Sequence, residues 1–243
     1  MSNLRNNCIT IHSIKYMKKF ILSIAFFFLL VIESTSHVDH YAQYNFLEYE
    51  LFRNNNSIGY HKYDFQRDGE NLSIKSEVSF KITKMGVDLY KYFAKSEENY
   101  KNSEFMSYSS KTKQNKKDRY VNIKLGSDKN YLLIDGSSYK GKADKNSIVG
   151  TWWNHEIIKK ETQISGISGR IIEQTVTFIG KEDVKIGNKI YKTLRFNFKS
   201  SDETLPDSKK LNTDIWYEEN TYLWVKAAFD KTGYWEYRLK NFN

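Results

Sequence analysis

Cysteine and proline are almost missing from this 243-residue sequence. The single cysteine, Cys8, precedes the start that we expect for the mature chain, which excludes disulfides and cysteine-based metal sites there. Pro206 is the only proline, so Asn, Asp, Gly, Ser and Lys must build the turns. The sequence has neither a Gly-rich phosphate loop followed by Lys-Ser or Lys-Thr nor a G-x-S-x-G motif. No cofactor is expected.

An N-terminal segment, 17–36, has the three parts of a secretory signal sequence. Two lysines follow its first methionine, and a strongly apolar, uncharged run covers 20–32. Ser34 and Ser36 are small residues at the −3 and −1 positions of a cleavage site after Ser36. The apolar run is shorter than the ~20 residues of a membrane-spanning helix. The pattern therefore predicts export, most simply to the periplasm.

The domain organisation follows from this leader. We predict that translation starts at Met17 and that 1–16 are an upstream extension. Residues 37–243 form a single β-rich domain, because no linker or shift in composition divides them. Retention of the leader as an N-terminal anchor is the alternative.

Aromatic residues are abundant, with 18 Tyr, 15 Phe and 5 Trp making 16% of the chain. Such residues favour half-buried, pleated surfaces. Alternation with a period of two dominates the mature chain, and 72–82 is the clearest example. We predict about ten or eleven strands, mostly joined as consecutive hairpins and therefore forming an antiparallel meander. The candidate segments for these strands, twelve in all, cover 44–53, 57–67, 72–82, 87–100, 104–113, 119–125, 130–135, 170–180, 189–199 and three segments within 212–242.

The first hairpin places odd-numbered apolar residues on one face of both of its strands. These residues are Leu47, Tyr49, Leu51, His61, Tyr63 and Phe65. Odd positions face odd positions only across a connection of three or five residues, unless a bulge intervenes. The three asparagines 54–56 fit a three-residue turn, since Asn tolerates the left-handed conformation.

Only 146–163 could contain a helix of useful length, and we predict one short helix near 151–161. Thr151 would cap it, and Glu156 and Lys160 are four residues apart. The predicted fold class is mainly β: a single curved antiparallel meander sheet that forms a half-barrel or open barrel. In an antiparallel sheet with one solvent-exposed face, the other, apolar face must be buried. Incomplete burial of that face leaves a ligand-binding cavity.

Polar clusters with catalytic potential are few. The segment 152–155, Trp-Trp-Asn-His, is either a helix start that packs on the sheet or a ligand-orienting site at a cavity mouth. His37 and His40 form an H-x-x-H pair that could bind a metal ion adventitiously. Adjacent carboxylates at 97–98 and 218–219 point to opposite faces of a strand, so neither pair can act jointly.

The net charge is +9, and lysines are densest in 111–119. This segment is either a solvated hairpin tip or a patch that attracts anionic lipid or nucleic acid. Tyrosines and tryptophans with basic neighbours could also stack on sugars or on single-stranded nucleic acid. Because we expect export, nucleic acid is not an expected partner.

Several segments resemble one family. They are 49–82, which contains "RNNNSIG", followed by 96–112, "GTWWNHEI" at 150–157, and 214–239. This set is similar to a group of bacterial exported proteins classed as domains of unknown function, whose hairpin carries R-N-G-x-x-I-G. Asn56 is taken as the residue at the usual glycine. The group is similar in turn to the half-barrel proteins that carry lipoproteins and lipids across the periplasm. That resemblance implies a curved antiparallel sheet with an apolar inner surface.

The sequence thus predicts a periplasmic, non-enzymatic protein that binds a lipid or another apolar ligand on the concave face of a curved sheet. Contact with a membrane would be transient, and an envelope protein is a further expected partner. The predicted cavity residues are Leu47, Tyr49, Leu51, His61, Tyr63, Phe65, Ile74, Val78, Phe80, Trp152, Trp153, Asn154 and His155. The alternatives are an envelope hydrolase that uses 152–155, and an outer-membrane β-barrel.

Overall fold

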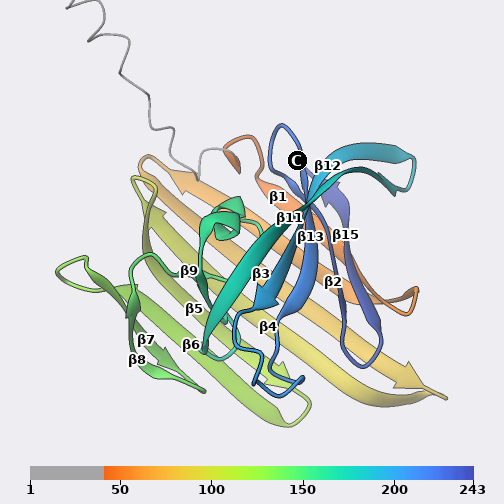
Figure 1. Ribbon diagram of the computed structural model, residues 1–243, viewed down its shortest axis with the longest axis horizontal. Helices are drawn as coiled ribbons and strands as arrows, with labels where there is room; N and C mark the ends of the chain where they lie inside the picture. Colours follow the sequence, from red (N-terminus) through yellow and green to blue (C-terminus); the bar gives the residue numbers. More distant parts are fainter. Residues whose placement is uncertain (1–40) are drawn as a thin grey trace, which may run out of the picture. The chain divides into compact units, whose positions relative to one another are not determined.

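The computed structural model describes residues 41–243, so the predicted leader and the predicted metal site at His37 and His40 lie outside the described residues. The described strands form one 15-stranded sheet (Figure 1). In chain order they are β1 (Phe46–Arg53), β2 (Asn56–Asp68), β3 (Asn71–Lys84), β4 (Val87–Lys101), β5 (Glu104–Gln114), β6 (Lys117–Leu125), β7 (Tyr131–Gly136), β8 (Lys140–Asp144), β9 (Ile148–Val149), β10 (Thr162–Ile164), β11 (Ile171–Ile186), β12 (Lys189–Ser200), β13 (Asn212–Glu218), β14 (Trp224–Asp230) and β15 (Tyr234–Phe242).

The sheet is a meander whose two edge strands are close in sequence. Its spatial order is β8-β7-β6-β5-β4-β3-β2-β1-β15-β14-β13-β12-β11-β10-β9. Only 145–147 separate the edge strands β8 and β9, and four peptide steps reach at most about 14 Å. The sheet must therefore curl until its edges come near each other, but the described edges do not pair, so it is not a closed barrel.

This architecture confirms the predicted mainly β, curved and open antiparallel sheet. Two details differ from the prediction. The sheet has more strands than expected, because β8, β9 and β10 have only five, two and three residues. Strands that short show no readable alternation. In addition, β9 and β10 pair in parallel, whereas the other pairs are antiparallel.

The first hairpin turns in two residues, so the predicted three-residue turn is wrong. Arg53 pairs with Asn56, which leaves Asn54 and Asn55 as the turn with φ of 50° and 64°. Positive φ at both central residues defines the type I′ turn, whose twist suits a hairpin. Asn55, and not Asn56, therefore occupies the position where the R-N-G motif has glycine.

A β-bulge in the same hairpin keeps odd positions facing odd positions. Leu51 pairs with Gly59 but Phe52 pairs with Ser57, so Ile58 is the extra residue on β2. The bulge is the exception that the sequence pattern left open, and it explains how a two-residue turn is compatible with that pattern.

Gly59 is required by the close approach of β3. A Cβ built at Gly59 would overlap the carbonyl oxygen of Ser79 and lie 2.6 Å from the Cα of Phe80. We expect Gly59→Ala to lower the free energy of unfolding by about 1–3 kcal/mol, because backbone atoms must move. Urea denaturation measures this loss, and Gln66→Ala, at an exposed position of the same strand, should stay within about 0.5 kcal/mol. Equal effects of the two variants would contradict the account.

The apolar inner face of the sheet is buried in two clusters. The larger one joins β1–β4 and β12–β15 and includes the fully buried Trp153 and Trp224. The smaller one joins β5–β8 with Val149 and Ile164. Tyr63 of the larger cluster and Tyr108 of the smaller cluster both line the pocket described below, which therefore lies between them.

The predicted helix exists as a single turn of 3-10 helix, η2 (His155–Lys159). Asn154 caps it by accepting a hydrogen bond from Glu156 N, so the predicted cap at Thr151 is wrong. Glu156 pairs with Lys159 at 2.8 Å instead of with Lys160. Among residues 41–243, no helix is long and apolar enough to cross a bilayer.

Candidate functional site

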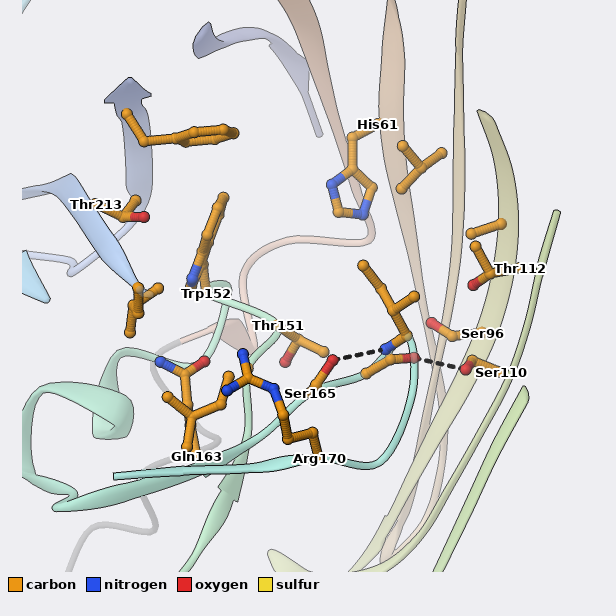
Figure 2. A pocket seen from close by; sticks show the side chains of 18 of the residues that line it. His61, Ser96, Ser110, Thr112, Thr151, Trp152, Gln163, Ser165, Arg170 and Thr213 are labelled. Carbon is orange, nitrogen blue, oxygen red and sulfur yellow. Dashed lines mark hydrogen bonds between the residues drawn. The ribbon is translucent and has the colours of Figure 1, made fainter. Parts of the chain in front are cut away.

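A pocket of about 590 Å³ lies inside the curled sheet (Figure 2). Strands β2–β5 form one wall, and 150–152, 163–172 and parts of β13–β15 form the other. The volume falls within the roughly 300–1,000 Å³ of small-molecule sites. Most of the lining residues at 207–212 and 230–231 are exposed, which places the opening there.

Small side chains in register across three strands create the hollow. Ser76 of β3 pairs with Ser96 of β4, and Ser96 pairs with Ser110 of β5. Two residues further along, Val78 pairs with Ala94 on the same face of the sheet. Figure 2 shows Ser96 and Ser110 on the pocket wall. Because none of these side chains is larger than valine, the space opposite them stays unfilled.

Hydrogen bonds fix the loop 165–170 against this wall. Ser110 Oγ donates to the carbonyl oxygen of Gly166 at 2.6 Å, and Tyr108 OH donates to the same oxygen at 3.0 Å. The hydroxyls of Ser76 and Ser96 bond to each other at 2.8 Å. The wall is therefore polar but largely self-satisfied, which suits a ligand that makes few hydrogen bonds there.

Aromatic rings line the opposite part of the pocket. The ring of His61 lies 4.3 Å from that of Tyr63 and 6.0 Å from that of Tyr237, measured between centroids. Trp152 contacts Tyr237 edge-on at 5.5 Å, and Phe229 also lines the space. Such rings offer a large apolar surface with a defined geometry.

His61 has no hydrogen-bonding partner. Both ring nitrogens are buried, and neither bonds to any group in the described part of the chain. Burial lowers the pKa of His61 to about 3, so the ring is neutral at physiological pH. A neutral imidazole offers one donor and one acceptor. His61 can therefore bond to a polar group of a ligand, or its ring can act as part of the apolar lining.

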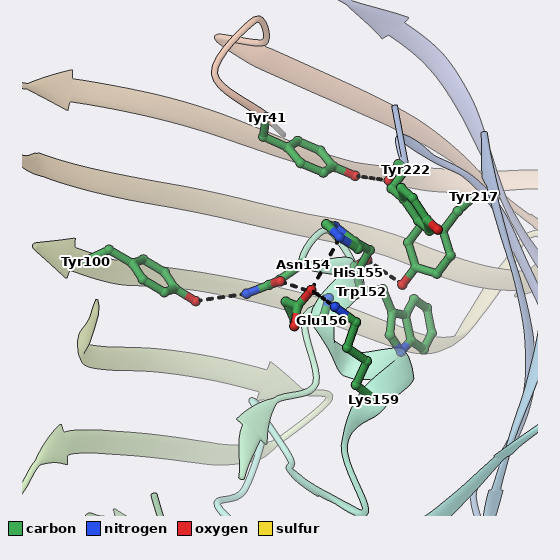
Figure 3. Close-up of polar contacts among 9 residues, drawn as sticks. All are labelled: Tyr41, Tyr100, Trp152, Asn154, His155, Glu156, Lys159, Tyr217 and Tyr222. Atoms are coloured by element: carbon green, nitrogen blue, oxygen red, sulfur yellow. Dashed lines mark hydrogen bonds and ion pairs between the residues drawn. The ribbon is translucent and has the colours of Figure 1, made fainter. Parts of the chain in front are cut away.

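The segment 150–152 covers the pocket in a strained conformation. Trp152 has a φ of 52°, which is unfavourable for a residue other than glycine. Tyr63 OH donates to the carbonyl oxygen of Thr151 at 2.8 Å, and Tyr217 OH donates to that of Trp152 at 2.9 Å (Figure 3). Strain persists only where the surroundings hold it. The tyrosines of the sheet therefore fix Trp152 above the pocket.

Glu98 of β4 also fixes this segment. Its carboxylate is buried and accepts hydrogen bonds from Tyr100 OH at 2.5 Å, Trp153 Nε1 at 3.1 Å and Thr151 Oγ1 at 3.3 Å. Burial raises the pKa of Glu98, and these three donors oppose the rise. Tyr100 OH also accepts from Asn154 Nδ2 at 3.4 Å (Figure 3).

The structure divides the predicted cavity residues. Those that line the pocket are His61, Tyr63, Val78 and Trp152. Those in the large apolar cluster are Leu47, Tyr49, Leu51, Phe65, Ile74 and Trp153, with Phe80 partly buried against it. The reason is the curl of the sheet, which packs β1 and the last part of β2 against β14 and the segment that leads into η2 and leaves no free space there.

Asn154 and His155 are buried at η2 and do not line the pocket. The hydrolase alternative required a carboxylate near His155, and Glu156 Oε1 lies 3.5 Å from His155 Nε2 (Figure 3). Both side chains are shielded from solvent, and His155 stacks on Tyr222 at 4.6 Å. This arrangement holds η2 against the β13–β14 connection, as expected for a helix start that packs on the sheet.

The remaining polar motifs have structural roles. Glu98 faces inward while Glu97 accepts from Ser73 Oγ on the other face of the sheet. Glu218 accepts from the backbone N–H of Thr221 at 2.7 Å and so shapes a turn. Within residues 41–243, no group of three or more His, Cys, Asp or Glu could hold a metal ion.

Fold and pocket together define a β-barrel-like protein with an open, curved sheet. The chain belongs to the DUF6134 family, whose model, described as a domain of unknown function, matches residues 49–240. This confirms the predicted membership of a family of unknown function. A comparison with curated proteins finds no match.

A solved structure supports the fold. The chain is similar to a beta-barrel-like protein of the domain of unknown function DUF1849 from Brucella abortus, with 11% identity and a TM-score of 0.59 over 82% of this chain and 96% of that chain. At this identity the likeness shows the fold alone. A DUF1329 family protein from Desulfovibrio piger matches with 9% identity over 85% of this chain and 89% of that chain, but its TM-score of 0.18 is too low to indicate a common fold.

Proposed function

We propose that this protein is an exported, non-enzymatic binding protein that holds the apolar part of a small ligand, such as the acyl chain of a lipid, inside its curved sheet. The observation that carries the proposal is the pocket of about 590 Å³ between the serine-lined strands β3–β5 and the aromatic rings around Trp152. Concave, mostly apolar sites of this size are the usual form of small-molecule sites.

Export is supported by the signal-like pattern of 17–36. Fractionation of the native host tests export, because a periplasmic protein is released together with the other periplasmic contents. Protein purified from that fraction should yield lipid on solvent extraction, detected by mass spectrometry. Recovery only with the cytosol, or preparations without bound lipid that also fail to bind fluorescent fatty acids, would contradict the proposal.

Filling the pocket should weaken binding without unfolding the sheet. Ala94 faces the pocket from β4, and Ala94→Leu places an isobutyl group in the hollow. We expect the affinity for a fluorescent fatty acid to fall at least tenfold, about 1.4 kcal/mol or more, because ligand volume is displaced. Ser109→Leu adds the same side chain at an exposed position of neighbouring β5 and should leave the affinity unchanged. Equal affinities of the two variants would place the ligand elsewhere.

A further inference from the structure

Three positively charged side chains gather at the open side of the pocket. Arg170 precedes β11, Lys209 lies in the loop before β13, and Lys231 follows β14, and all three line the pocket. Figure 2 shows Arg170 extending into the pocket region near Gln163 and Ser165. Segments far apart in sequence thus supply one basic cluster at one opening.

Positive charge exceeds negative charge in this part of the lining, where two carboxylates, Asp207 and Asp230, stand against Arg170, Lys209, Lys210 and Lys231. Of the two carboxylates that line the pocket, Asp207 pairs with Lys210 at 3.0 Å, and Asp230 forms no ion pair. Arg170 Nη2 donates to the carbonyl oxygen of Lys209 at 2.9 Å, and Lys231 Nζ donates to that of Ser208 at 2.6 Å. These bonds hold Arg170 and Lys231 on the same loop without neutralising either.

Arg170 and Lys231 are close enough to repel each other. Partial burial lowers the pKa of Lys231, and the nearby Arg170 guanidinium lowers it further. Like charges held together with too few counter-charges are unfavourable, and a bound anion lowers that cost. The guanidinium has five N–H donors and the ammonium has three, so most donors remain available after the two loop contacts.

We propose that the ligand is amphipathic, with an anionic carboxylate or phosphate head bound by Arg170, Lys209 and Lys231 at the opening, while its apolar chain extends toward Trp152 and Tyr237. This inference rests on the proposed function, since it assigns the chemistry of the same ligand. The charged head stays near solvent, where its partial hydration is kept, and the chain lies against the aromatic rings.

Competition against a fluorescent fatty acid tests the head group. The probes are hexadecanoic acid, hexadecyl phosphate, hexadecanol and inorganic phosphate, and each is tested against the full-length protein. We expect both anionic amphiphiles to bind about ten- to a hundredfold more tightly than hexadecanol, as charge-assisted hydrogen bonds predict. Inorganic phosphate should bind at least tenfold more weakly than hexadecyl phosphate, because it lacks the apolar chain.

Variants link the preference to the cluster. The double variant R170Q/K231Q should lose the preference for hexadecanoic acid over hexadecanol while keeping the affinity for hexadecanol. The control K111Q/K113Q removes the same charge from exposed positions of β5 and should keep the preference. Equal binding of acid and alcohol by the wild type would overturn this inference and leave the proposed function intact. Binding of neither would overturn the proposed function, and phosphate that binds as tightly as hexadecyl phosphate would show a free-anion site instead.

Discussion

Replacing Glu98 with alanine is expected to lower the free energy of unfolding by about 3–5 kcal/mol, since each buried donor left unpaired costs about 1–3 kcal/mol. The change removes the acceptor that Tyr100, Thr151 and Trp153 share, and it leaves a cavity beside a buried indole. Urea denaturation followed by fluorescence measures the loss. Affinity for a fatty acid should fall as well, because the segment that carries Trp152 is no longer fixed.

Glu98→Gln is the matched control, because it keeps the volume and one acceptor oxygen, and it should cost less than half as much.

The pKa shift of Glu98 also predicts how its contribution to the stability changes with pH. Since the pKa of Glu98 is raised in the folded protein, its contribution is fully present below the unfolded value of 4.5 and is lost as the pH rises through the folded value. The wild type should therefore gain stability relative to Glu98→Gln as the pH falls toward 4.5. A Glu98→Ala variant as stable as the wild type would show that this network does not fix the segment.

Acidification is expected to destabilise the protein through His61 by roughly 2–3 kcal/mol between pH 7 and pH 4.5. The pKa of His61 is lowered to about 3 in the folded protein, against 6.5 for an ordinary imidazole. The unfolded chain therefore binds a proton in this interval while the folded chain does not, and each pH unit below 6.5 shifts the balance by about 1.4 kcal/mol. The cause is burial beside Tyr63 and Tyr237 with no partner for the charged ring.

His61→Phe isolates this term. It keeps an aromatic ring against Tyr63 and removes the titrating group, so the difference between wild type and variant cancels the contribution of Glu98. The difference between the two unfolding free energies should be constant near pH 7. Below pH 6 it should change steadily in favour of the variant. Parallel curves down to pH 4.5 would mean that protons reach His61 in the folded protein.

Alternation along the chain predicted the sheet because the period of two survives wherever one face is buried. It also identified the paired faces of β1 and β2, and it left two ways to connect them, a longer turn or a bulge. It could not show which part of the inner face stays empty. Leu47 and Ser96 both face inward, but the curl of the sheet packs Leu47 against other strands and leaves Ser96 beside the pocket.

The signal for the pocket was present but depended on register. The serines at 76, 96 and 110 are unremarkable singly and become a hollow only when three strands align them. The basic cluster was beyond sequence reasoning for a similar reason, since Arg170, Lys209 and Lys231 come from three loops with no fixed spacing. The positive φ of Trp152 is incompatible with a helix that starts at 151, and tyrosines from distant strands hold this conformation.

Photo-crosslinking tests the central claim most directly, namely that an acyl chain lies inside the curved sheet. Hexadecanoic acid with a diazirine at its terminal carbon would be irradiated with the full-length protein, and the modified residues would be located by mass spectrometry. The account predicts adducts on the peptides of β2, the 150–152 segment and β15, which contain His61, Trp152 and Tyr237. Adducts confined to the exposed apolar tip of the β3–β4 hairpin, at Met85 and Val87, would contradict it.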